Sequence, residues 1–140
     1  MFRLSTLILL VCLFVSCHKG GKEQQQPVCA VKACTKIFVT VGVKFTNAQG
    51  DPIAVKNFSA INQRTKSKLV VSSATYDLMP GYFIIANDNT LDQLSTAGDD
   101  VLVSADHPVT GEVKAAMFKI SGGCNCHVEK LSGPETIVFN

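Results

Sequence analysis

Apolar and polar residues alternate with a period of two over much of the chain after residue 36. Between residues 37 and 45 every second position is a large apolar residue, and Thr40, Gly42 and Lys44 stand between them. Such alternation is typical of a β-strand that buries one of its faces. We therefore predict a strand over 37–45.

Shorter apolar runs follow, each bounded by residues that favour turns. They predict further strands at 53–61, 69–71, 82–85, 101–103, 113–120, 126–131 and 137–139. Gly50 and the Pro80-Gly81 pair suit turns, 62–68 is a polar, basic loop, and only 91–94 suggests a helical turn. Seven or eight short strands with frequent turns predict an all-β fold, a single antiparallel β-sandwich over residues 29–140.

The start of the chain has a different pattern. One positive charge, Arg3, precedes an apolar run over 4–15, which is too short to cross a bilayer and ends at Ser16-Cys17. This pattern predicts a lipoprotein signal peptide over 1–16, with Cys17 as the thiol that receives the lipid. A plain secretory signal, cut at a small residue, is the alternative.

Residues 17–28 would then be the lipidated cysteine and a flexible tether, because 18–27 contains no large apolar residue. The region 18–22 lacks acidic residues, which favours an outer-membrane lipoprotein on the periplasmic face, with surface exposure as the alternative. Removing the signal with Arg3 leaves twelve basic and eleven acidic residues, and this balance gives no nucleic-acid footprint. The predicted partners are the membrane, through the lipid, and an unidentified envelope protein.

Four cysteines remain after Cys12 leaves with the signal and Cys17 takes the lipid. They are Cys29, Cys34, Cys124 and Cys126, an even number in an oxidising compartment. In an extended segment the side chains of Cys124 and Cys126 would lie about 6.6 Å apart, too far for a disulfide. Both remaining pairings join the start of the domain to its end.

Two sequence motifs resemble those of a known domain family. The first is Val-x-Val-x-Phe-x-Asn-x-x-Gly-x-Pro, which ends at Pro52, and the second is Leu-x-Pro-Gly-Tyr, which ends at Tyr82. Together they resemble immunoglobulin-like and transthyretin-like domains of carboxypeptidase-regulatory type, which implies a β-sandwich. With the Cys17 site, Cys-Thr at Cys34 and Cys-His-Val-x-Lys-x-Ser-Gly-Pro from Cys126, the chain also resembles small lipoproteins of Bacteroidota, which implies no particular activity.

Candidate chemistry is sparse. The four cysteines with His127 could hold zinc in place of disulfides, and a calcium site could draw on the acidic residues Asp88, Asp92, Asp99 and Asp100. The histidines His18, His107 and His127 show no recognisable triad partners, so no catalytic residue is assigned. We therefore predict a non-enzymatic, lipid-anchored binding, adaptor or structural module without cofactor or metal. An envelope metal-binding protein or enzyme is the alternative.

Overall fold

The computed structural model describes residues 28–71 and 79–140. The predicted signal peptide, Cys17 and the tether up to residue 27 lie outside the described residues. Within these described residues there are seven strands and one short 3-10 helix: β1 (Thr40–Thr46), β2 (Lys56–Asn62), β3 (Tyr82–Asn87), η2 (Asp88–Gln93), β4 (Asp99–Asp106), β5 (Val113–Ser121), β6 (Glu129–Ser132) and β7 (Thr136–Val138).

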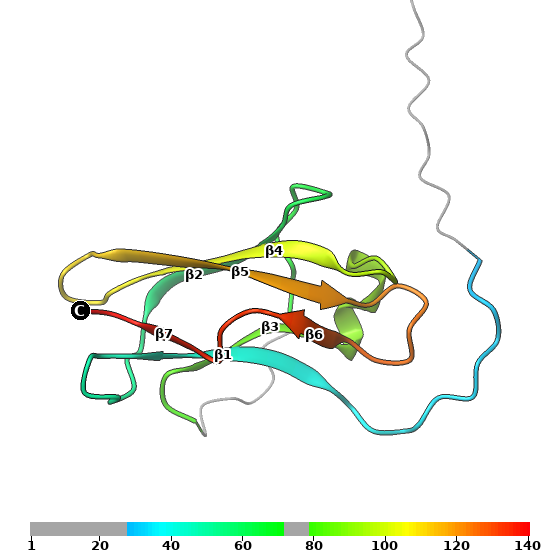
Figure 1. Cartoon of the computed structure of the whole chain (residues 1–140), viewed down its shortest axis with the longest axis horizontal. Coiled ribbons are helices and arrows are strands. Elements are labelled where there is room, and N and C mark those ends of the chain that lie inside the picture. The colour runs from blue at the N-terminus through cyan, green and yellow to red at the C-terminus, as the bar shows by residue number, and fades with distance from the viewer. Residues whose placement is uncertain (1–27, 72–78) are drawn as a thin grey trace, which may run out of the picture.

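The strands form two sheets that face each other, which confirms the predicted sandwich (Figure 1). One sheet has the order β3-β1-β7 and the other has the order β2-β4-β5-β6. All neighbours are antiparallel except β1 and β7, which run parallel through the Phe45 and Ile137 pair. The predicted antiparallel pairing therefore holds for the described strands with this one exception. The chain crosses to the second sheet before it returns as β7, so the last strand can lie beside the first in the same direction.

The core lies between the sheets and is built by the predicted alternation. In β1 the side chains of Val41, Val43 and Phe45 are buried, while Lys44 is exposed. Phe45 packs edge-on against Phe83 at a ring-centroid distance of 5.5 Å, and further rings surround it, from Phe58 and Phe139. Edge-to-face pairs at this spacing add to the free energy gained by removing the rings from water.

Three predicted strands begin later in the structure, at Thr40, Lys56 and Glu129, and a fourth is absent. Strand β1 begins at Thr40 because its neighbour β3 ends opposite it at Asn87, so residues 37–39 have no strand to pair with. Residues 69–71 form no strand, and only a single bridge joins Lys68 to Ile61. Strand β6 begins at Glu129, since 122–127 form a turn with its own contacts.

A glycine allows β6 and β7 to connect over the core. Gly133 has a φ of +126°, and an added Cβ would overlap the ring of the fully buried Phe118. Both observations require glycine at this position, because side chains rarely adopt this φ and no space remains for one. The close approach places the backbone of the β6–β7 connection directly on the core.

Candidate functional site

The segment that leads from the tether into the sandwich is fixed by two disulfides. We call residues 28–39 the N-terminal arm; it lies at the end of the sandwich opposite the C-terminus (Figure 1). Cys29 bonds Cys124 and Cys34 bonds Cys126, with Cα–Cα distances of 5.2 and 5.4 Å. The prediction that the disulfides join the two ends of the domain is confirmed, and one of the two open pairings is selected. The oxidised sulfurs are not available as the thiolates that a zinc site requires.

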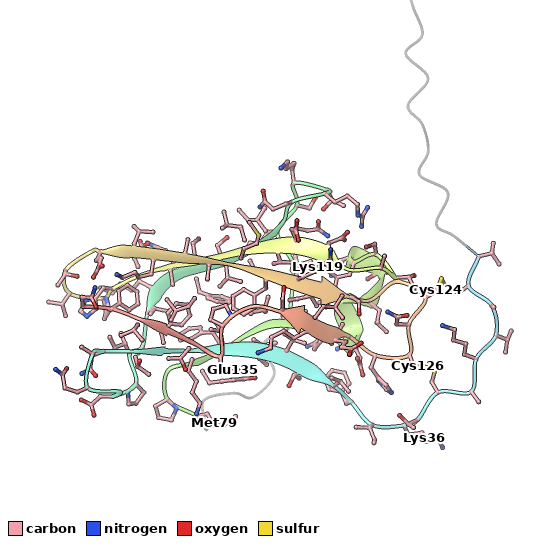
Figure 2. All side chains as sticks on the ribbon, in the orientation of Figure 1. Lys36, Met79, Lys119, Cys124, Cys126 and Glu135 are labelled. Carbon is pink, nitrogen blue, oxygen red and sulfur yellow. A yellow bond between two sulfur atoms is a disulfide. The ribbon has the colours of Figure 1, made fainter. Side chains whose placement is uncertain are left out.

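The second cysteine of each disulfide lies on the loop between β5 and β6. Figure 2 shows Cys124 and Cys126 at the same end of the molecule as Lys36 of the arm. The loop is held in turn by Thr96, whose hydroxyl accepts the Cys124 N–H at 3.0 Å and whose carbonyl accepts the Asn125 amide at 3.0 Å. The arm is therefore fastened to a loop that is itself anchored to the sandwich.

Asp88, the first residue of η2, connects three segments of the chain. Its carboxylate accepts the backbone N–H of Val39 from the arm at 2.9 Å and that of Val128 from the β5–β6 connection at 3.0 Å. The same carboxylate lies 2.8 Å from Nδ1 of His127. Burial alone would raise the pKa of Asp88, but the hydrogen bonds from Val39, His127 and Val128 outweigh it, so the pKa lies below its usual value.

His127 continues this contact to the arm. Its Nε2 lies 2.8 Å from the hydroxyl oxygen of Thr35, while its Nδ1 faces Asp88. A hydroxyl, an imidazole and a carboxylate in this order match the arrangement of nucleophile, base and orienting acid in hydrolases. The arrangement also binds the arm to the sandwich, together with a hydrogen bond of 3.1 Å from the Lys32 ammonium to the Cys124 carbonyl.

This contact was not predicted from the sequence, although the approach of Thr35 to His127 had a signal there. Thr35 follows Cys34 and His127 follows Cys126, so the disulfide between these cysteines brings their neighbours together. A pairing of Cys34 with Cys126 would therefore have predicted the Thr35 and His127 contact. Asp88 is distant in sequence and had no comparable signal.

The four acidic residues that could have formed a calcium site do not lie in one group. Asp88 belongs to the contacts of the arm, whereas Asp99 lies inside the sandwich beneath the loop after β2. Asp92 and Asp100 are exposed. Within 28–71 and 79–140, no cluster of three or more His, Cys, Asp or Glu side chains could hold a metal ion.

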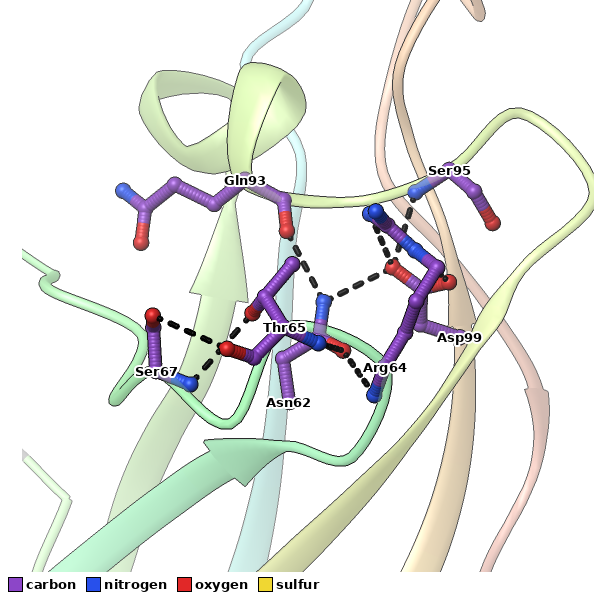
Figure 3. Close-up of polar contacts among 7 residues, drawn as sticks. All are labelled: Asn62, Arg64, Thr65, Ser67, Gln93, Ser95 and Asp99. Carbon is purple, nitrogen blue, oxygen red and sulfur yellow. Dashed lines mark hydrogen bonds and ion pairs between the residues drawn. The ribbon is translucent and has the colours of Figure 1, made fainter. Parts of the chain in front are cut away.

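Asp99 is the centre of a second polar cluster (Figure 3). Arg64 donates two hydrogen bonds to its carboxylate at 2.8 and 2.9 Å, and the Asn62 amide donates a third at 2.7 Å. The backbone N–H of Ser95 donates a fourth at 3.0 Å. Burial raises the pKa of Asp99, but these hydrogen bonds outweigh it and hold the pKa at about 2. The buried carboxylate thus holds the loops after β2 and η2 together.

A shallow, open depression of about 300 Å³ lies beside this cluster, lined by Gln63, Arg64, Gly98, Asp99, Asp100 and Lys119. Arg64, which the sequence placed in a basic loop, has its charge compensated by Asp99. His107 is a turn residue: its Nδ1 accepts the N–H groups of Val109 and Thr110, and its ring packs on Phe139. Neither feature brings together a nucleophile and a base.

Fold and site together describe a β-sandwich with a doubly disulfide-bonded N-terminal arm. No protein-family model, curated protein or solved structure matches the chain. Among the described residues, no helix has the length and apolar character needed to cross a membrane.

Proposed function

We propose that this protein is a lipid-anchored module of the cell envelope, whose sandwich binds or supports a partner at a distance set by the tether. The lipid would be carried by Cys17, and the protein would act without catalysis, cofactor or metal. The predicted place is the periplasmic face of an outer membrane.

The position of the two disulfides carries this proposal. They lie at the end of the predicted tether, and they join the arm to a loop 92 and 95 residues further along the chain. Disulfides persist in oxidising compartments, which agrees with export of the chain. The two bridges fix the point of the sandwich from which the tether leaves, which suits a domain held at a membrane.

The anchor is tested by replacing Cys17 with serine. We expect the wild-type protein to incorporate a palmitate analogue and to sediment with membranes, and the Cys17→Ser variant to lose the label and the membrane association while it keeps its fold. Cys12→Ser is the matched control, because Cys12 lies within the predicted signal and its loss should change neither result. Membrane association of the Cys17→Ser variant would contradict the proposal.

The contact of Thr35, His127 and Asp88 supports a second candidate function, an esterase or acyltransferase that uses the Thr35 hydroxyl. His127 would take the hydroxyl proton and Asp88 would orient the imidazole, as in hydroxyl nucleophiles activated by an adjacent base.

A fluorophosphonate probe separates the two functions. A hydrolase would be labelled in the wild type and unlabelled in Thr35→Ala, whereas Thr110→Ala, a threonine in the turn after β4, would keep its label. A wild-type protein that reacts no faster than Thr35→Ala would exclude catalysis at Thr35 and leave the binding module.

A further inference from the structure

The N-terminal arm exposes large apolar side chains that the sandwich does not cover. Val28 and Val31 are fully exposed, at 101% and 103%, and Ile37 and Phe38 are exposed by 67% and 54%. Single exposed apolar residues are common on protein surfaces. Here, however, four exposed apolar residues are concentrated in one segment of twelve residues, which indicates a contact surface.

The charge of the arm suits a negatively charged partner. Lys32 and Lys36 lie between the apolar residues, and the arm contains no acidic residue. This combination of apolar and basic side chains suits a membrane interface, where apolar groups enter the boundary between headgroups and acyl chains and cations meet anionic lipids.

The proximity of the arm to the anchor selects the membrane as the partner. Eleven residue steps separate Cys17 from Val28, so the start of the arm can be at most about 40 Å from a lipid-modified Cys17. A surface held this close has an effective concentration in the millimolar range, at which weak contacts become occupied. The disulfides add to this effect, because they keep the arm at one end of the sandwich and thereby set which end faces the lipid.

We propose that the N-terminal arm is a membrane-contact surface, with Phe38 and Ile37 entering the lipid interface and Lys36 facing anionic headgroups. This inference rests on the proposed lipid anchor. The membrane contact would also orient the anchored domain: the arm end of the sandwich lies against the bilayer, and the end with the C-terminus and the β4–β5 turn points away (Figure 1).

The absence of tryptophan from the chain allows a direct test, because each introduced tryptophan is the only one. The full lipidated protein is prepared as Phe38→Trp and, as a matched control, as Val109→Trp. Val109 is 87% exposed and lies in the turn between β4 and β5. Strand β5, with nine residues, spans about 30 Å between this turn and the arm end. Each variant is mixed with vesicles that contain phosphatidylglycerol and brominated lipids, and its flotation and fluorescence are measured.

Both variants should float with the vesicles. We expect the bromines to reduce the fluorescence of Phe38→Trp about twofold or more, because interfacial side chains lie about 5–10 Å into the bilayer, and to leave Val109→Trp unchanged. Flotation with equal fluorescence in plain and brominated vesicles would overturn the contact and assign the arm to a protein partner. A wild-type protein that fails to float would refute the anchor itself and the orientation with it.

Discussion

Removing one of the two disulfides should destabilise the protein far less than the length of its own loop suggests. In the chain-entropy model, a single bridge that closes about 95 residues removes conformational entropy from the unfolded chain and so stabilises the folded state by about 4.7 kcal/mol. The two bridges are close neighbours, however. Once Cys34 and Cys126 are joined, the second bridge closes only a ring of six residues from Cys29 to Cys34 and three from Cys124 to Cys126.

A ring of nine residues corresponds to about 2.5 kcal/mol in the same model. Either single removal, as Cys29→Ala with Cys124→Ala or Cys34→Ala with Cys126→Ala, should therefore lower the free energy of unfolding by about 2.5 kcal/mol. Removal of both should lower it by about 7 kcal/mol, which exceeds the sum of the single effects by about 2 kcal/mol. These are upper values, because a released arm also gains entropy in the folded state.

Urea unfolding followed by far-ultraviolet circular dichroism measures these differences, with Cys17→Ser as the control that should leave the transition unchanged. Losses that simply add, or a single removal that costs as much as a 95-residue loop, would refute the reasoning. If the quadruple variant is already unfolded without urea, it is measured in a stabilising osmolyte, together with the wild type and the two double variants.

Two further predictions concern the sandwich itself. The folded pKa of Asp99, about 2, lies below its ordinary value of 3.8, so its contribution of about 2 kcal/mol is present above pH 5 and is lost as the pH falls toward 2. Urea unfolding at pH 6 and pH 3 should therefore show about half of this loss, about 1 kcal/mol, in the wild type and in Asp100→Asn but a smaller one in Asp99→Asn, and equal losses in all three would contradict it. Gly133→Ala should lower the free energy of unfolding by about 3 kcal/mol, because its Cβ meets Phe118 at an unfavourable φ. Gly111→Ala is the control: with a φ of +72° and open space around it, it should cost about 1 kcal/mol, and thermal unfolding that shows equal losses for both would contradict the packing argument.

The strand core of this protein could be predicted from its sequence because burial on one face forces apolar residues into alternate positions. That signal located β1 through Val41, Val43 and Phe45, and it also located β5. It extended β1 too far toward its start, because Ile37 continues the alternation without any neighbouring strand. Strand ends depend on the partner strand, and the alternation within one strand does not contain that information.

The candidate site was predictable only where covalent geometry restricted the choices. The prediction that Cys124 and Cys126 do not pair with each other is confirmed, although they lie in a turn and not in the extended segment from which the spacing was worked out. The role of Asp88 depends on η2 bringing a carboxylate to the backbone of Val39 and Val128, residues 49 and 40 positions away. Contacts of this kind arise from the tertiary fold and leave no local pattern in the sequence.

The disulfides also determine how the molecule would transmit a pulling force. A load applied between the N-terminal tether and a partner held at β6 or β7 would pass through the Cys29–Cys124 bond directly into the last part of the chain. Strands β1 to β5 lie outside that covalent path, so about 300 Å of extensible chain is kept out of reach of the load. An oxidised protein would thus behave as a short, nearly inextensible link, and reduction of both bonds would turn it into a long one.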